Sequence, residues 1–401
     1  MFGEFQIIHY LCGRFHNEHY VTMADNKVYI TKTSSFFPNN PVENDEIEAY
    51  LGRIGDKKSR VMPIILRQNG IKKRYYAIDK NQNITHSNSE LAKEAIDKLL
   101  PNSADKRSIQ FLACGTSTPD QMLPSQASMI HGAAFEQPME IISCAGVCLS
   151  GIQAFKAAFM SVKCGNTQNA ISTTSELPSP ALLSKFFEEE YAHIAKITER
   201  PYIAFEKDFL RFMISDGAAA VLLENQPSGE INLEVEWVEV ISYANRLPAC
   251  MYQWCEKTPD GNLKSWKEFS ADDISNKSIW CIKQDVKLLN EHIMRLFAEA
   301  TQHALLKNKA DENRIRYVIP HISSMYFYNI LDEELKKKGV SLPTSKWYTN
   351  LTWVGNVGSV APFAALDELI RTKPLEKGDQ ILLLVPESGR FSYGIALLTC
   401  R

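Results

Sequence analysis

The sequence predicts a large α/β protein in which helices cover layers of strands. Short apolar runs of strand length alternate with amphipathic segments of helix length along the chain, the pattern of layered α/β folds. Each half of the chain runs from strand to long helix to strand, an order that permits a duplicated plan. The 401 residues, 45% hydrophobic and 23% charged, suit a soluble globular protein with more than one small core.

The first half opens with a predicted strand, a turn rich in proline and asparagine, and a helix after Asn44, all within residues 28–52. Asn69-Gly70 predicts a turn, and residues 87–100 predict a helix. The other strands expected here cover 109–117, 140–143, 169–176 and 214–225, and the other helices cover 146–165, ending at Gly165, and 181–199.

The second half is expected to repeat this alternation, with one loop over 265–273. The elements predicted for it are a strand over 231–244, a helix over 285–308, a strand over 315–323, a helix over 327–339, and a helix, strand, tight turn and strand over 361–400.

Composition excludes several classes of protein. The net charge is -3, and the sequence shows no concentrated basic face of the kind that nucleic-acid binding needs. No stretch approaches the ~20 apolar residues of a membrane span. The 9 cysteines, an odd number without a C-x-x-C pair, argue against a disulfide framework or a zinc ribbon and predict a reducing, cytoplasmic location. Residues 1–24 are interpreted as an extension rather than a signal peptide, because His9 breaks their apolar run and no small-residue cleavage site follows.

The segment 141–155, IISCAGVCLSGIQAF, raises the question of whether Cys144 is a nucleophile or one more buried thiol. Cys144 is expected at the first turn of a helix, where unpaired N–H groups and the positive end of the helix dipole favour a thiolate. Ala145 and Gly146 would let a substrate approach the sulfur. The local pattern fits a packed cysteine equally well, and Cys148 is expected to pack into the core.

His321 and Asn356 are the candidate partners of a cysteine nucleophile. His321 follows a predicted strand in YVIPHIS, a position that would aim an imidazole outward. Asn356 lies between glycines in GNVGS, where the backbone can turn tightly. In isolation, an ordinary loop histidine and a simple turn explain these two residues equally well.

The order of the motifs SCAG, SDGAAAVLLE, IPH, GNVGS and SGRFSYGIALL, from about Val28 to Arg401, resembles the β-ketoacyl-acyl-carrier-protein synthase III group of thiolase-fold condensing enzymes. The resemblance implies a five-layered αβαβα fold of two duplicated lobes, 25–228 with the nucleophilic cysteine and 229–401 with the histidine and asparagine. It also implies a homodimer and no metal or cofactor, since the phosphopantetheine arm of an acyl carrier protein enters as part of the substrate.

The resemblance also assigns roles in catalysis. Cys144 would be the acylated nucleophile, and His321 and Asn356 would bind the carbonyl of the second thioester. The amides of Cys144 and Gly389 would form the oxyanion hole. The acyl-cysteine would then be attacked by the carbanion of the second substrate, which forms a new carbon–carbon bond.

Several positions depart from the pattern of this group. Only the middle glycine of its glycine-rich turn is kept in Ser388-Gly389-Arg390, and Arg390 would lie near the substrate pocket, as would Leu123. Ile64 and Gln68 stand where the group has a Trp and an Arg for coenzyme A, so a carrier protein is the expected donor. The basic residues expected to meet its acidic helix, or else to form a solvated face, are Lys72, Lys73, Arg74 and Arg295.

Glu176 predicts a further step. In a thioester cavity, desolvation would raise the pKa of a glutamate and let it abstract a proton, although a structural, hydrogen-bonded glutamate explains it nearly as well. With Glu176, the chain looks like the ketosynthase/cyclase branch, which joins a β-ketoacyl carrier substrate to a second acyl thioester and closes a cyclohexanedione-type precursor of dialkylresorcinols or stilbenes. The alternatives are an ordinary decarboxylative synthase III that uses a malonyl carrier, and a non-catalytic homologue acting as a partner subunit.

Overall fold

The computed structural model describes residues 26–54, 58–188, 209–230 and 232–401. The extension predicted over 1–24 lies outside these residues, as does most of the helix predicted over 181–199. The part of that helix inside them forms two short 3₁₀ turns, Ser179–Leu182 and Ser184–Phe186.

A nine-stranded sheet organises the chain, in the strand order β13-β14-β15-β8-β1-β7-β6-β4-β5. Its strands are β1 (Tyr29–Phe36), β4 (Phe111–Thr116), β5 (Glu140–Ala145), β6 (Asn169–Glu176), β7 (Gly217–Glu224), β8 (Leu233–Ser242), β13 (Ile315–Pro320), β14 (Gln380–Glu387) and β15 (Ser392–Cys400). β1 pairs with β7 along most of its length but meets β8 only through Tyr29 and Ile30. The sheet therefore consists of two halves joined at one corner.

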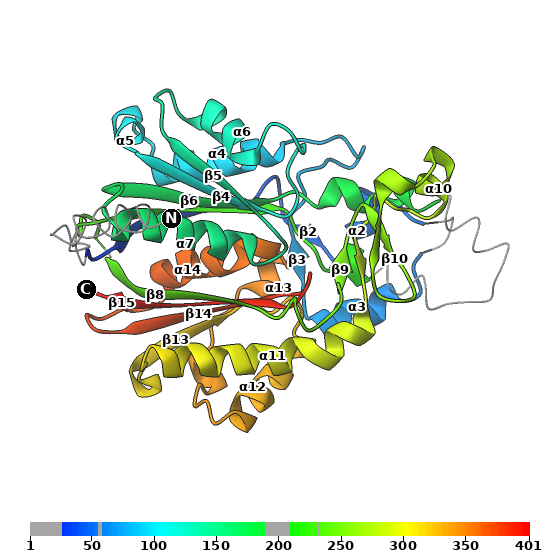
Figure 1. The fold of residues 1–401 in the computed structure, drawn as a ribbon. Helices are drawn as coiled ribbons and strands as arrows, with labels where there is room; N and C mark the ends of the chain where they lie inside the picture. The colour runs from blue at the N-terminus through cyan, green and yellow to red at the C-terminus, as the bar shows by residue number, and fades with distance from the viewer. Residues whose placement is uncertain (1–25, 55–57, 189–208, 231) are drawn as a thin grey trace, which may run out of the picture.

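Helices separate and cover these two halves (Figure 1). α7 (Ser150–Lys163) and α14 (Ala361–Thr372) lie between the halves. α4 (Asn88–Leu99) and α6 (Gln126–Ala134) cover one outer face, and α11 (Val286–Lys307) and α12 (Tyr326–Lys337) cover the other. The predicted αβαβα layering is confirmed. Its division into lobes at residue 228 falls in the connection from β7 to β8 and stays a prediction.

Shorter elements surround the sheet. The strands are β2 (Val42–Glu43), β3 (Lys73–Arg74), β9 (Met251–Tyr252), β10 (Cys255–Lys257), β11 (Leu263–Ser265) and β12 (Lys283–Gln284). The helices are α2 (Ile47–Leu51), α3 (Met62–Asn69), α5 (Ser103–Arg107), α10 (Ala271–Asn276) and α13 (Leu351–Val354). The loop predicted over 265–273 thus contains the start of a helix, because Ser270 Oγ accepts the Asp273 N–H and caps it.

The helix predicted from Gly146 begins later than expected. β5 continues through Ala145, a turn follows, and α7 starts at Ser150. The Ser150 N–H donates to the Val147 carbonyl at 3.1 Å, which closes that turn. The prediction that Cys144 lies at the first turn of a helix is therefore wrong, because Cys144 belongs to the strand.

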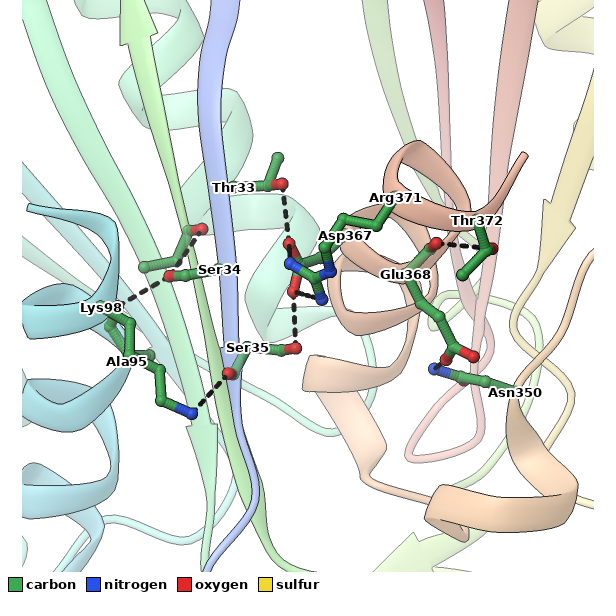
Figure 2. Close-up of polar contacts among 11 residues, drawn as sticks. Thr33, Ser34, Ser35, Ala95, Lys98, Asn350, Asp367, Glu368, Arg371 and Thr372 are labelled. Atoms are coloured by element: carbon green, nitrogen blue, oxygen red, sulfur yellow. Dashed lines mark hydrogen bonds and ion pairs between the residues drawn. The ribbon is translucent and has the colours of Figure 1, made fainter. Parts of the chain in front are cut away.

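A buried carboxylate ties β1 to α14 (Figure 2). Asp367 of α14 is 0% exposed and accepts hydrogen bonds from Thr33 Oγ1 at 2.9 Å and Ser35 Oγ at 2.6 Å. Arg371, one turn further on, pairs with it through both terminal nitrogens. These bonds offset the cost of burying the charge. They fix the helix that directly follows the loop carrying Asn356.

Candidate active site

One narrow cavity brings together a cysteine, a histidine and an asparagine from three distant parts of the chain. Cys148, His321 and Asn356 all line it, with Pro386 and Ser388 from the end of β14. Its volume is ≈ 40 Å³, which holds only a few waters, since one needs about 10–15 Å³. Much of the remaining wall is apolar and includes Met213, Met251, Met294, Phe209 and Phe327. Methionine side chains are flexible, so this wall can adapt to an incoming chain.

Cys148 lies in the turn between β5 and α7, just ahead of the helix, and is 8% exposed. Burial raises the pKa of its thiol, and the negative charges of Glu176 and Glu387 raise it further. The neutral thiol is therefore its resting form, and a proton must leave the sulfur as it reacts.

His321 follows β13 directly and is held by the neighbouring strand. Its backbone N–H donates to the Leu384 carbonyl of β14 at 2.8 Å, which fixes where the ring enters the cavity. The side chain is 4% exposed, and Nε2 has no partner among the described residues. Burial lowers the pKa of His321 to about 4, so the imidazole is neutral near pH 7. Buried polar groups are normally hydrogen-bonded, so this nitrogen is available to bond to a ligand.

Asn356 is placed by backbone bonds on both sides. Its N–H donates to the Met213 carbonyl at 3.1 Å, and its carbonyl accepts the Ser215 N–H at 2.9 Å. Gly355 precedes it with φ of 77°, and a Cβ there would lie 2.9 Å from Ser215 Cβ, so this close approach needs glycine. Oδ1 accepts the Gly358 N–H at 3.2 Å, which leaves the Nδ2 amide as the donor of this side chain.

Comparisons with known proteins show which proteins this chain is similar to. Residues 305–400 match the family described as 3-oxoacyl-[acyl-carrier-protein (ACP)] synthase III C terminal. A β-ketoacyl-[acyl-carrier-protein] synthase III from Clostridium perfringens (strain SM101 / Type A) is 25% identical over 364 residues, which cover 90% of this chain and 96% of that relative. The chain is thus similar to β-ketoacyl-ACP synthase III proteins over most of its length.

Solved structures share the fold of this chain. OleA from Xanthomonas campestris, solved with bound lauric acid and lauroyl-CoA, has a TM-score of 0.70 at 18% identity and covers 94% of this chain and 99% of its own. AbyA1, a tetronic acid condensing enzyme, has a TM-score of 0.68 at 19% identity and covers 93% and 99%. The predicted thiolase-type fold is confirmed, and so is the predicted class, an acyltransferase-type ketosynthase.

Cys144, the nucleophile predicted from the sequence, lies elsewhere in the ketosynthase. It sits in β5 opposite Gly115 of β4 and packs half-buried against the core. Burial raises the pKa of its thiol too. It is not among the described residues that line the cavity, whereas Cys148, which the sequence placed in the core, is.

Close packing around α7 explains which cysteine reaches the cavity. A Cβ on Gly151 would lie 2.6 Å from the Ser359 carbonyl, and one on Gly115 would lie 2.3 Å from the Ser150 carbonyl. The start of α7 can therefore press against β4 and the Asn356 loop only where these positions lack side chains. Gly151, three residues after Cys148, is the residue that marks this contact in the sequence, although its role becomes visible only beside the Ser359 carbonyl.

Glu176 ends β6 and is 3% exposed, with every oxygen engaged. It accepts the Ser117 N–H at 3.1 Å, the Ser117 Oγ–H at 2.8 Å, the Thr118 Oγ1–H at 2.9 Å and a bond from Ser359 Oγ. Burial raises the pKa of Glu176 against the opposing effect of these bonds. The residue is absent from the described lining of the cavity and joins β6 to the loop that holds Asn356.

The predicted oxyanion donor Gly389 is already engaged. Its N–H donates to Glu387 Oε1 at 2.5 Å, so in this structure the amide is bonded to a carboxylate of its own turn. Leu123 and Arg390, the residues predicted for the substrate pocket, do not line the described cavity: Leu123 is 85% exposed, and Arg390 Nε donates to the Leu247 carbonyl at 3.1 Å.

The basic residues predicted to dock a carrier protein differ in exposure. Arg74 is 0% exposed, with Nη2 donating to Asn44 Oδ1 at 2.6 Å, so the prediction that it meets a carrier is wrong. Lys73 pairs with Glu43 at 2.9 Å. Lys72 and Arg295 are exposed. The sequence could not separate these residues, because a basic run does not reveal which side chain turns inward.

The described residues contain no group of three His, Cys, Asp or Glu side chains placed to hold a metal ion. Within the same ranges, no helix has the length and apolar character to cross a membrane.

Proposed function

We propose that the chain joins two acyl thioesters by Claisen condensation through an acyl-enzyme on Cys148, with His321 and Asn356 as donors to the second thioester. The observation that carries this proposal is the single cavity lined by all three side chains. It replaces Cys144 by Cys148 in the role that the sequence analysis assigned to the nucleophile.

Acylation is the first step. The sulfur of Cys148 attacks the thioester carbonyl carbon, a new carbon–sulfur bond forms, and the donor's carbon–sulfur bond breaks. The proton of the Cys148 thiol ends on the departing thiol. Because the resting thiol is neutral, the rate of this step depends on how readily that proton is lost.

Condensation is the second step. His321 and Asn356 both line the cavity, and His321 Nε2 and Asn356 Nδ2 are the proposed donors that stabilise an enolate oxygen of the second thioester. The carbanion forms when the second thioester loses carbon dioxide, if it is a malonyl thioester, or an α-proton to a base. It attacks the acyl-Cys148 carbonyl, the carbon–carbon bond forms, the carbon–sulfur bond to Cys148 breaks, and the released thiolate takes up a proton to restore the neutral thiol. Both donors work uncharged in a buried site, where their hydrogen bonds are strong.

The exposed residues indicate which partners this protein would bind. An acyl carrier protein is the proposed donor, because its acidic helix can meet the exposed Lys72 and Arg295. A second copy of the chain is the proposed partner at β5, which ends the described strand order and has exposed residues along it, including Ile142 at 40%. The loop with Leu123 leads into α6, which packs on β5, so this copy would cover it.

The finer proposal is that the product is a ring. In this form of the reaction, a β-ketoacyl carrier substrate is joined to a second acyl thioester, and Glu176 takes up the proton for ring closure. Its buried carboxylate and its effect on the Cys148 pKa support a place near the chemistry. Its four hydrogen-bonding groups would first have to release an oxygen, whereas decarboxylation of a malonyl carrier, the alternative, needs no such base.

Intact-mass measurement of the protein after mixing with an acyl carrier substrate tests both levels. An acyl adduct is expected on the wild type and on Cys144→Ala but not on Cys148→Ala. An adduct that survives in Cys148→Ala removes the assignment of Cys148. Analysis of the released product then separates the finer proposals, because ordinary synthase chemistry yields carbon dioxide and a linear product from a malonyl carrier.

A further inference from the structure

The turn after β14 folds a carboxylate onto its own backbone. Glu387 ends β14 and pairs with Ser392 across the hairpin. Its side chain is 7% exposed, and it accepts the N–H groups of Gly389 at 2.5 Å and of Arg390 and Ser392 at 3.2 Å. The guanidinium of Arg390 donates instead to the carbonyl of Leu247. Backbone amides therefore supply the hydrogen bonds of this buried charge.

The same turn touches the turn that carries the nucleophile. A Cβ on Gly389 would lie 2.9 Å from Val147 Cγ2, on the residue before Cys148, and 2.0 Å from Glu387 Oε1. Only glycine allows the carboxylate to close over this amide while the two turns stay in contact. The Gly389 carbonyl is fixed separately by the Cys250 N–H at 2.8 Å. The Gly389 N–H thus lies beside the turn that carries Cys148, but it is already hydrogen-bonded to Glu387.

A carboxylate in this place opposes acyl transfer in two ways. It competes for an N–H that could stabilise the oxygen of a tetrahedral intermediate, and a charge-assisted bond of this kind is strong. Its charge also faces Cys148, whose pKa it raises, together with Cys250 and Tyr393 from neighbouring segments. In the resting structure the Gly389 N–H is bonded to Glu387, whereas during acyl transfer it would have to bond to the oxygen of the tetrahedral intermediate.

We propose that Glu387 is a positioning residue that controls the Gly389 N–H: the resting enzyme holds this donor on the Glu387 carboxylate, and Cys148 is acylated when the carboxylate gives it up to the thioester oxygen. The inference rests on the proposed function of Cys148. The carboxylate makes and breaks no covalent bond. The thioester oxygen takes over the N–H as the Cys148 sulfur adds to the carbonyl, and the thiol proton leaves with the departing donor thiol.

Single-turnover acylation by octanoyl-pantetheine, followed by intact-mass measurement, tests this inference. Glu387→Gln keeps an acceptor oxygen but loses the charge, so acylation of Cys148 is expected about tenfold faster, part of the roughly 10²- to 10³-fold that an oxyanion donor contributes. Glu90→Gln is the matched control, because Glu90 also accepts a backbone N–H, from Ser87 at 2.7 Å, in the cap of α4. The control should acylate at the wild-type rate.

Glu387→Ala guards against a purely structural effect. It removes the competitor altogether, so the folded fraction of this variant should also acylate faster than the wild type. If Glu387→Gln acylates at or below the wild-type rate, or if Glu387→Ala loses acylation in proportion to its loss of folded protein, Glu387 only caps the hairpin and the inference is overturned. A wild-type chain that takes no acyl group on Cys148 would instead remove the proposed function itself.

Discussion

Cys144 and Cys148 are close in sequence but occupy two different regions of the molecule. Cys144 lies on β5, the last strand in the described sheet order, and among the described strands β5 pairs with β4 alone. Cys148 lies in the next turn, where α7 presses against the Asn356 loop from the other half of the chain. The contact between the two halves, rather than the small residues beside a cysteine, therefore decides which thiol meets its partners.

The two regions also differ in how their side chains are hydrogen-bonded and buried. Around the cavity, Thr174 Oγ1 and Ser359 Oγ lie 2.7 Å apart, and Ser359 also bonds to Glu176, so β6 and the Asn356 loop are joined by buried polar contacts. On β5, Ser143 Oγ accepts the Ala127 N–H of α6, and much of the strand is exposed. Changes in the cavity should therefore have larger effects than changes on β5.

The largest expected effect comes from removing a donor in the cavity. Asn356→Ala should lower the rate of condensation roughly 10²- to 10³-fold, because one of the two donors to the enolate oxygen is lost. Acylation of Cys148 should persist in this variant. Cys144→Ala on β5 should keep the condensation rate within about twofold of wild type. Steady-state product formation measures both variants, and an equal loss in the two would break the distinction between the regions.

A smaller effect is expected from adding a methyl group where α7 meets the Asn356 loop. In Gly151→Ala, the new Cβ would lie 2.6 Å from the Ser359 carbonyl, so backbone must shift. The free energy of unfolding should fall by about 1–3 kcal/mol, and the rate of condensation should fall with it. Gly132→Ala on the exposed side of α6 is the control: its Cβ would meet nothing within 4 Å, and a gain of about 0.5–1 kcal/mol is expected. Urea unfolding curves in which both variants shift alike would contradict the packing argument.

The layers and two of the three cavity residues could be predicted from the sequence. Alternating apolar runs give the order of strands and helices, and a residue directly after a strand, such as His321, points toward the end of the sheet. Cys148 could not be identified in this way, because the sequence does not fix where β5 ends and α7 begins. The choice depended on Gly151, whose role appears only when the opposing Ser359 carbonyl is in place.

The remaining differences have the same physical origin. Arg74 belongs to a basic run, yet it pairs with Asn44 inside the protein, a contact between segments distant in sequence. Glu387 carries no motif of its own, and its importance arises because the carboxylate turns back onto the Gly389 N–H beside Val147. Local patterns predict which elements form, whereas long-range packing decides which side chains are buried together.

The smallest effect we predict separates a buried cavity residue from the protein surface by its response to acid. The pKa of His321 is lowered from its ordinary value of 6.5 to about 4, so between these values the unfolded chain binds a proton that the folded chain does not. Stability is therefore lost as pH falls through this window. Between pH 7.5 and pH 5.5, burial of the neutral His321 imidazole should lower the free energy of unfolding of the wild type by about 1 kcal/mol. His321→Gln lacks the titrating group, so it should lose that much less stability over the same pH range. Urea unfolding at the two pH values measures the difference, with His303→Gln on the exposed side of α11 as the matched loss of a histidine. An identical response of the wild type and His321→Gln would mean that the imidazole reaches solvent, and the cavity would then lack the dry donor on which condensation at Cys148 depends.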